Sequence, residues 1–214
     1  MPLLLELFSG TGSVGKGFAA LGGWEVVSVD IDSKSRPTIV ADVLRLDPRC
    51  LPTPDFVWAS PPCTHYSRAR TTAKTPRDLI GSDALVQKTL DIVEHFGGVP
   101  FIMENPFTGL LKSRPVIQGI PMRVVDYCVY GAPYRKRTAL WTNTAWRPAR
   151  PLCRQDCSSC TTEGKHLAHA QQGSGAKGGT PGRPLEHLHA LPAQLVREIA
   201  EFVHICSSET NKYL

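Results

Sequence analysis

The chain has 214 residues, of which 42% are hydrophobic and 20% are charged, and these values are typical of a globular protein with one well-cored domain. No apolar run reaches membrane-spanning length, and the N-terminus lacks the basic region of a signal peptide. The seven cysteines are an odd number and favour a reducing compartment, so we expect a cytoplasmic protein. The net charge of +5 permits a polyanionic partner without requiring one.

The chain opens with the pattern of a strand, a glycine turn and a helix. Residues 3–8 are apolar except for Glu6 and predict a buried strand, which runs into Ser9-Gly10-Thr11-Gly12-Ser13. Helical spacing of apolar residues then continues to Gly22-Gly23. Such a unit begins many nucleotide-binding α/β domains, because glycines let a ligand approach the backbone closely. A phosphate-binding P-loop is excluded, since no Gly-Lys-Ser/Thr follows.

Two further strands are predicted to end in carboxylates. Residues 25–29 lead to Asp30, and residues 39–41 lead to Asp42. An acidic side chain at the end of the second strand can accept hydrogen bonds from both hydroxyls of a ribose. Ligands of parallel sheets bind at the carboxyl ends of the strands, so we expect a nucleoside site at this edge. A solvated turn aspartate is the alternative for each residue singly.

Cys63 follows a fourth predicted strand, at residues 56–59. Pro61 and Pro62 hold the intervening chain stiff and extended, so the thiol is presented at the tip of the strand. Arg68 and Arg70 come soon after, and positive charge lowers the pKa of a thiol. This arrangement predicts a cysteine nucleophile, whereas an isolated cysteine is more often a small buried apolar residue.

The next segments place more polar groups near this edge. Residues 67–82 form a predicted basic loop, a helix follows from Ser82 to a Gly97-Gly98 end, and a strand at 101–103 leads to Glu104. Glu104 would therefore share a crevice with Cys63. Strands at 124–127 and 139–142 are predicted to pair, and three consecutive cations between them, Arg135, Lys136 and Arg137, favour an anionic substrate over a merely solvated hairpin.

Four of these segments resemble the motifs of the C5-cytosine DNA methyltransferase family. They are similar, in family order over residues 3–142, to its cofactor motif (Leu7-Phe8-Ser9-Gly10-Thr11-Gly12), its Pro-Cys motif (Ser60-Pro61-Pro62-Cys63), its Glu-Asn-Val (Met103-Glu104-Asn105-Pro106) and its Gln-x-Arg-x-Arg (Tyr134-Arg135-Lys136-Arg137). Small phage and virus members, which have a Tyr-Gly-x-Pro-Tyr-Arg-Lys stretch, are the most similar. The resemblance implies a Rossmann-like class I S-adenosylmethionine-dependent methyltransferase fold, α/β, with a mostly parallel sheet and helices on both faces.

The resemblance also implies a site and a reaction, which would transfer a methyl group from S-adenosylmethionine to C5 of cytosine. Cys63 would add to C6 of the base, Glu104 would bind and protonate its N3 side, and Arg135 and Arg137 would hold its carbonyl and the backbone phosphate. The cofactor would contact Phe8, Ser9, Gly10, Thr11, Gly12, Asp30, Ile31, Asp42 and Pro61, and the nucleic acid would contact Ser67, Arg68, Arg70 and Asn105. A stacked base is inaccessible to such chemistry, so the cytosine must be flipped out or single-stranded.

Three regions are expected: a catalytic core at 1–142, a small Cys/His- and Gly-rich insert at 143–190, and a C-terminal helix at 191–214 that packs back on the core. The insert is too short for the large recognition domain of sequence-reading relatives, so relaxed sequence specificity is expected with DNA as the partner. RNA, a free cytidine nucleotide or a non-catalytic nucleic-acid-binding homologue are the alternatives. No oligomeric state follows from the sequence.

The insert has the composition of a metal knuckle. Cys153, Cys157 and Cys160 lie close together and are followed by His166 and His169, and three thiolates with one imidazole can complete a tetrahedral zinc site. His166 is the predicted fourth ligand, with His169 as the alternative. The alternative is a set of free thiols on a polar loop. Glycine-rich residues 173–179 predict a flexible segment. A helix is predicted from Pro192 to Cys206, followed by a frayed tail at 207–214.

Overall fold

The computed structural model describes residues 1–71, 73–170 and 185–210 and contains a seven-stranded sheet in the order β3-β2-β1-β4-β5-β7-β6. The strands are β1 (Leu3–Leu7), β2 (Glu25–Asp30), β3 (Ile39–Val40), β4 (Phe56–Ala59), β5 (Phe101–Pro106), β6 (Met122–Asp126) and β7 (Arg137–Thr142). Neighbours from β3 to β5 pair in parallel, whereas β7 pairs antiparallel with both β5 and β6. The predicted mostly parallel α/β sheet is confirmed.

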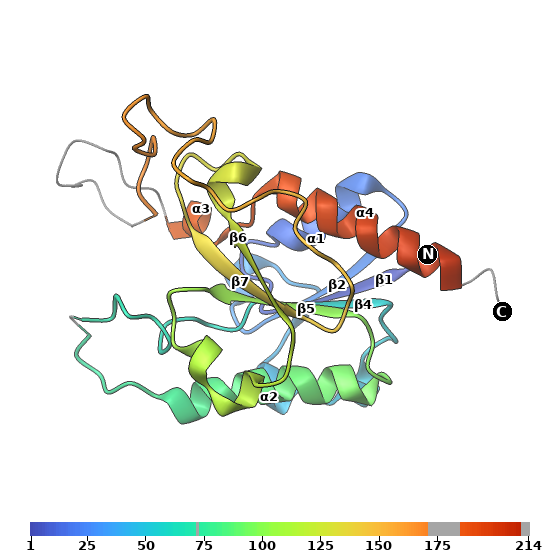
Figure 1. Ribbon diagram of the computed structural model, residues 1–214. Coiled ribbons are helices and arrows are strands. Elements are labelled where there is room, and N and C mark those ends of the chain that lie inside the picture. Colours follow the sequence, from blue (N-terminus) through green and yellow to red (C-terminus); the bar gives the residue numbers. More distant parts are fainter. Residues whose placement is uncertain (72, 171–184, 211–214) are drawn as a thin grey trace.

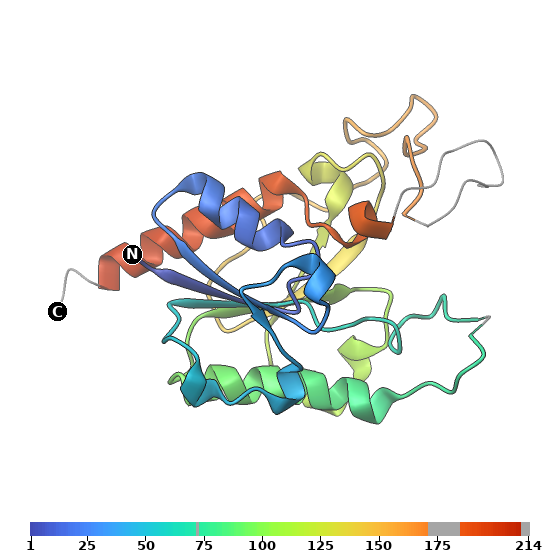
Figure 2. The same cartoon turned by 180° about the vertical axis from the view of Figure 1, so that it is seen from behind.

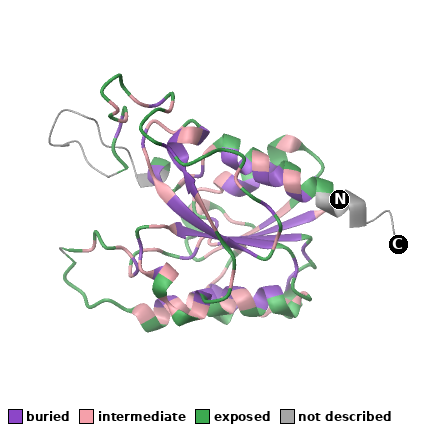
Figure 3. Cartoon of the chain, viewed as in Figure 1, coloured by how far each residue is buried: buried purple, intermediate pink, exposed green. Residues whose placement is uncertain are grey.

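Helices cover both faces of this sheet (Figures 1 and 2). Helices α1 (Ser13–Leu21) and α4 (Ala193–Thr210) lie together on one face, and α2 (Leu79–His95) lies alone on the other. Alternate residues of a strand point to opposite faces, so Leu4 packs towards α1 and α4 while Leu5 packs on the side of α2. One apolar core therefore lies on each face of the sheet. The strands between these cores are buried, as their purple colour in Figure 3 shows.

The ends of two helices differ from the predicted ones. Helix α2 begins at Leu79 rather than at Ser82, because the carboxylate of Asp78 accepts a hydrogen bond from Gly81 N and caps the first turn. The basic loop is correspondingly shorter. Helix α4 continues to Thr210, beyond the predicted start of the frayed tail at 207. The short helix α3 (Leu185–His189) was not predicted.

Two loops project from the side on which the parallel strands end (Figure 1). One is the basic loop between β4 and α2, and the other is the cysteine-rich insert after β7. Both are largely exposed (Figure 3). The predicted flexible segment at 173–179 lies outside the described residues. Within the described part of the chain, no helix combines the length and the apolar character needed to cross a membrane.

Candidate active site

A pocket of about 250 Å³ opens at the carboxyl edge of β1, β2 and β4. Its wall includes the glycine turn after β1, the Pro-Cys loop after β4 and the acidic end of β5. Of the predicted residues, those that line it are Phe8, Ser9, Gly10, Thr11, Asp30, Pro61, Cys63 and Glu104. The structure thus brings the predicted nucleophile, the predicted acid and the predicted cofactor turn to one cavity.

The backbone of the glycine turn adopts conformations that are strained for residues other than glycine. Phe8, Gly10 and Gly12 have φ values of 57°, 47° and 64°, a left-handed region in which glycine is at ease and phenylalanine is not. Gly10 N donates a hydrogen bond of 2.8 Å to Asp30 Oδ2, which ties the turn to the end of β2. Strain held in place by neighbouring contacts is a common feature of ligand sites.

This part of the pocket fits an adenosine-type ligand. The carboxylate of Asp30 is held by Gly10 N and by Asp32 N, and its remaining lone pairs can accept hydrogen bonds from ribose hydroxyls. Of the other predicted cofactor contacts, Gly12 and Ile31 do not line the pocket. Ile31 follows Asp30 and has 71% of its surface exposed, which is unusual for isoleucine and leaves an apolar face beside the pocket. Asp42 does not line the pocket; its side chain accepts from Leu44 N and lies 3.9 Å from Arg45 Nε.

Glu6 is a buried acid in the pocket wall to which no sequence pattern assigns a role. It lies in β1, and its Oε2 accepts a hydrogen bond of 3.1 Å from Gly15 N in α1. Burial raises the pKa of Glu6 to about 7, although its backbone hydrogen bonds and Lys16 act in the opposite direction. The side chain therefore links the strand to the helix that follows the glycine turn.

Cys63 is half-buried and held by its neighbours. The side chain of the wholly buried Asn105 donates a 2.9 Å hydrogen bond to Pro61 O, so β5 fixes the Pro-Cys loop that follows β4. Asn105 itself does not line the pocket. Burial, followed by the charge of Glu104, raises the pKa of the Cys63 thiol, and Lys136 lowers it. The predicted lowering of this pKa is thus not found, because burial outweighs nearby positive charge.

Glu104 lies near the end of β5 and is almost fully buried. Its Oε1 accepts a hydrogen bond of 3.3 Å from Tyr127 Oη and lies 3.8 Å from Lys136 Nζ. Lys136 also donates to Leu188 O at 2.9 Å and lines the pocket. The carboxyl of Glu104 is thus held between a phenol and an ammonium group.

Lys136, rather than either neighbouring arginine, reaches the pocket. Arg137 Nη2 lies 2.8 Å from Asp126 Oδ2, and Arg135 Nε lies 3.4 Å from the same oxygen. Burial raises the pKa of Asp126, but the two arginines outweigh it and bring that pKa below its usual value. Side chains of extended chain alternate in direction, so the flanking arginines and the central lysine face opposite ways.

His189, at the end of α3, lies in the pocket wall beside these groups. Burial, followed by the positive charge of Lys136, lowers the pKa of His189. No sequence pattern points to His189, because the fold brings it to the sheet from beyond the insert. The basic segment 135–137 indicated that a cation lies near the site. Which of its side chains points into the pocket depends on the residue at which β7 begins.

The basic loop folds back on itself. Arg70 donates hydrogen bonds to the backbone oxygen and the hydroxyl of Thr75, and Arg77 donates to His65 O and Ser67 O. Ser67, Arg68 and Arg70 do not line the pocket, and Arg68 is exposed. These three predicted nucleic-acid contacts therefore lie outside the cavity, on a projecting loop.

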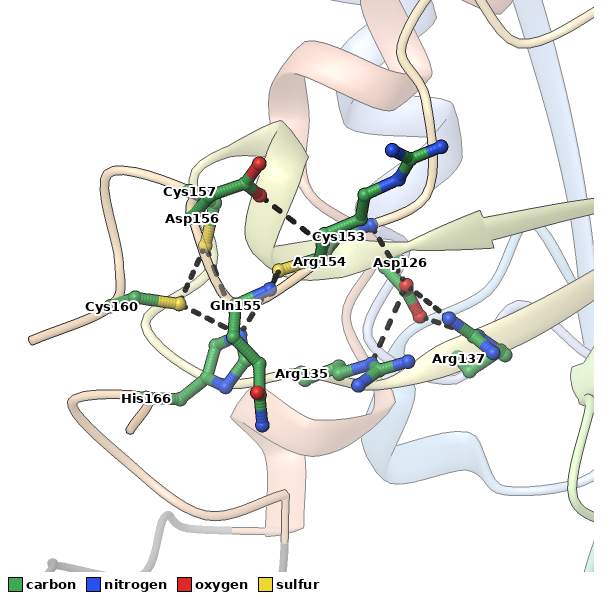
Figure 4. Close-up of polar contacts among 10 residues, drawn as sticks. All are labelled: Asp126, Arg135, Arg137, Cys153, Arg154, Gln155, Asp156, Cys157, Cys160 and His166. Carbon is green, nitrogen blue, oxygen red and sulfur yellow. Dashed lines mark hydrogen bonds and ion pairs between the residues drawn. The ribbon is translucent and has the colours of Figure 1, made fainter. Parts of the chain in front are cut away.

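The insert brings sulfur and nitrogen atoms together (Figure 4). His166 Nε2 lies 3.6 Å from Cys153 Sγ, 3.8 Å from Cys157 Sγ and 3.5 Å from Cys160 Sγ. A further cysteine, Cys128, joins them, because donor atoms of Cys128, Cys153, Cys157 and His166 all lie within 4.8 Å of one another. Such a set can bind a metal ion. Sequence spacing could not identify Cys128, since it precedes β7.

Comparison with known proteins agrees with this geometry. Residues 3–115 match the family model of the C-5 cytosine-specific DNA methylases. The chain is 38% identical over 157 residues to the "Probable DNA (cytosine-5)-methyltransferase" of Frog virus 3 (isolate Goorha), an alignment that covers 65% of this chain and 70% of the viral protein.

Solved structures share the fold. A putative DNA modification methyltransferase from an E. coli prophage matches with a TM-score of 0.50 and 20% identity, over 66% of this chain and 46% of that one. The S. pombe Dnmt2 methyltransferase matches with a TM-score of 0.51 and 15% identity, over 81% of this chain and 62% of that one. The chain thus spans about half to three-fifths of their lengths. With the family model covering more than half of its residues, the chain belongs to the C-5 cytosine-specific DNA methylase family and is an enzyme of the DNA (cytosine-5-)-methyltransferase class.

Proposed function

We propose that this protein transfers a methyl group from S-adenosylmethionine to C5 of cytosine in DNA, with relaxed sequence specificity, through a covalent bond between Cys63 and C6 of the base. The observation that carries the proposal is the single pocket in which Cys63, Glu104 and the glycine turn after β1 face one another. A thiol, a carboxyl and a nucleoside cradle are the groups that this reaction requires.

The residues of the glycine turn and Asp30 would hold the cofactor, with Ile31 against its adenine. When bound, the cofactor supplies the methyl group as an electrophile. Gly10 and Thr11 lie in the same pocket wall as Cys63, so a base attached to the sulfur would lie beside that methyl group. Proximity of this kind converts a difficult bimolecular step into an intramolecular one.

Cys63 would begin the reaction as a thiol, since burial and Glu104 raise its pKa. The carboxylate of Glu104 would take the proton of the thiol, the sulfur would bond to C6, and Glu104 would pass that proton to N3 as the electron pair of the C5–C6 double bond moves to C4–C5, which leaves C5 nucleophilic. After C5 gains its methyl group, N3 would return its proton to Glu104. Water would then remove the proton of C5, the C5–C6 double bond would re-form, and the sulfur would leave C6 as a thiolate that Glu104 reprotonates.

Lys136 would act with Glu104 at the edge of the base. Its ammonium group is 3.8 Å from Glu104 Oε1 and opposes the effect of that carboxylate on Cys63. An ammonium group can also donate a hydrogen bond to the cytosine carbonyl, the role that the motif resemblance gives to Arg135 or Arg137. We therefore assign Lys136 to the base and the two arginines to the surface around Asp126.

Nucleic acid would approach between the two projecting loops. The base must leave the duplex to reach a pocket whose thiol is half-buried. Ser67, Arg68 and Arg70 lie on the loop that follows the nucleophile, where they would meet phosphates. The insert is small and would read little sequence, and we propose that it carries a structural zinc ion.

Covalent trapping tests this function. The protein is incubated with S-adenosylmethionine and 5-fluorocytosine-containing duplex DNA, single-stranded DNA or RNA, and adducts are separated by denaturing electrophoresis. We expect an adduct with DNA that Cys63→Ser abolishes and Cys50→Ser, at an exposed cysteine, retains. An adduct that survives Cys63→Ser would remove the assigned nucleophile, and one that forms only with RNA would replace the DNA substrate.

A further inference from the structure

We infer that one zinc ion is bound by Cys128, Cys153, Cys157 and His166, and that it fastens the insert to the segment that carries Lys136. Three of these ligands belong to the insert, whereas Cys128 lies in the short 3₁₀ helix Tyr127–Tyr130 directly after β6. The ion would therefore join two parts of the chain rather than close a loop within one of them.

The distances fit a tetrahedral zinc ion. Zinc–sulfur bonds of about 2.3 Å and zinc–nitrogen bonds of about 2.0–2.1 Å give a sulfur–nitrogen edge of about 3.5–3.6 Å. His166 Nε2 lies 3.6 Å from Cys153 Sγ and 3.8 Å from Cys157 Sγ. Thiolate-rich sites favour zinc over magnesium or calcium, which prefer oxygen ligands.

Cys128 is a better fourth ligand than Cys160. Cys160 is the competing ligand, since its Sγ also lies 3.5 Å from His166 Nε2. All donor atoms of the set that includes Cys128, however, lie within 4.8 Å of one another, and Cys128 is wholly buried. Cys160 Sγ lies 3.3 Å from Cys157 Sγ, which is shorter than the sulfur–sulfur edge of about 3.8 Å that two zinc–sulfur bonds of this length give. Cys160 would then be a thiol beside the ion and not one of its ligands.

The middle of the insert has little apolar core. Trp146 and Ala168 anchor its two ends in the core, and Ala149 and Arg150 donate hydrogen bonds to Glu198 and Val129. Between residues 151 and 167, all of which the structure describes, Cys153 and Ser159 are the only buried residues, and the regular pairing in this stretch is the single bridge between Cys160 and His166. Segments that cannot bury enough apolar surface are commonly stabilised by a metal ion or by disulfides. A bound ion would supply this polar segment with the cross-link that its few buried residues do not.

One ligand, Cys153, is joined to the ion pairs around Asp126 (Figure 4). Cys153 N donates a hydrogen bond of 3.1 Å to Asp126 Oδ2, and the same carboxylate holds Arg135 and Arg137. Lys136 lies between these arginines and points into the pocket. The ion would thus hold Asp126 in two ways. Its ligand Cys128 lies two residues further along the chain, and the backbone of its ligand Cys153 donates a hydrogen bond to the Asp126 carboxylate. Lys136 is thereby positioned, a consequence that rests on the proposed function.

Metal content tests the ligand set without any methyl transfer. The whole protein, purified from zinc-supplemented medium, should contain one zinc ion per chain by elemental analysis. After exchange for cobalt, its visible spectrum should be tetrahedral, and its sulfur-to-cobalt charge-transfer band should have the intensity of three thiolates. Cys128→Ser should lower that band by about one third, and Cys160→Ser should leave it unchanged, in proportion to the number of thiolate ligands.

The conservative variant Cys128→His, which keeps a ligand, guards against simple misfolding and should retain the metal while reducing the band. Absence of zinc from the folded wild-type protein overturns the site. If the charge-transfer band keeps its full intensity in Cys128→Ser and loses about one third of it in Cys160→Ser, then Cys160 and not Cys128 is the ligand. That result overturns the proposed connection between the insert and the segment after β6.

The positioning of Lys136 has its own readout. Removal of zinc by a chelator should shift the pH profile of Cys63 alkylation to higher pH, because the ammonium that lowers the pKa of this thiol would lose its place. In Lys136→Met the same chelation should cause no shift. An unchanged profile in the wild-type protein would show that the ion stabilises the insert alone. Failure of methyl transfer with these results intact would instead count against the proposed reaction.

Discussion

Lys136 Nζ lies 3.8 Å from Glu104 Oε1, and both side chains line the pocket that contains Cys63. The two groups act on the thiol with opposite sign, since the carboxylate raises its pKa and the ammonium lowers it. Each can therefore be removed in turn, and the reactivity of Cys63 followed separately from methyl transfer.

Replacement of Lys136 by methionine should slow alkylation of Cys63 by iodoacetamide. Loss of the ammonium leaves burial and Glu104 to act on the thiol without opposition, so its pKa rises further. A rise of one pKa unit lowers the thiolate fraction about tenfold. Peptide mass spectrometry distinguishes Cys63 from the other cysteines. Lys136→Arg keeps the charge and is the matched control; equal rates in both variants would contradict the assigned effect.

Glu104→Gln should have opposite effects on the two reactions. Methyl transfer should fall by about 10²–10⁴-fold, the typical contribution of a general acid. Alkylation of Cys63 should become faster at the same pH, because the charge that raises the pKa of the thiol is gone. Slower alkylation would indicate that the variant has disturbed the pocket, and unimpaired methyl transfer would remove Glu104 from the mechanism.

Stability should depend on pH through Glu6. Burial raises the pKa of this group from 4.5 to about 7, so the folded chain retains a proton that the unfolded chain releases. Its contribution is therefore complete at low pH and is lost as pH rises from about 4.5 to about 7, by roughly 3 kcal/mol. In Glu6→Gln, urea unfolding at pH 5 and pH 8 should show a smaller difference than in the wild-type protein. An equal or larger difference would assign the pH dependence elsewhere.

Gly17 of α1 packs directly against Val196 of α4. A Cβ atom at this position would clash with Val196 Cγ1, so the valine side chain or the helices would have to shift. Gly17→Ala should therefore destabilise the protein by about 1–3 kcal/mol, the usual cost of overpacking. Thermal unfolding measures the effect. The double variant Gly17→Ala/Val196→Ala has room for the added methyl group and should recover part of the loss; additive losses would argue against this contact.

The sequence was sufficient for the residues that follow parallel strands. Cys63 and Glu104 were expected to share a crevice because β4 and β5 were expected to run in parallel, and they do share the pocket. Gly10 and Asp30 were placed by the same rule. This inference needs only strand order and direction, which apolar patterns indicate well.

Other features depend on register and on contacts between distant segments. Whether Lys136 or its flanking arginines face the pocket depends on the residue at which β7 begins, and a shift of one residue reverses the answer. Cys128 joins the insert cysteines only because β6 ends beside them. The pKa of Cys63 depends on burial, which no local pattern gives.

The order β4-β5-β7 has a consequence for how this enzyme can vary. Cys63 follows β4, Glu104 lies in β5 and Lys136 precedes β7, and these three strands are adjacent in the sheet. The hydrogen bonds between the strands set the spacing of the three positions. The spacing of Cys63 and Glu104 therefore does not depend on the length of the segment after β7, whereas the place of Lys136 does, because Leu188 and Cys153 beyond β7 hold Lys136 and Asp126. A chain with a longer or shorter segment there would keep the sulfur and the carboxyl in place and would have to rebuild the support of the ammonium.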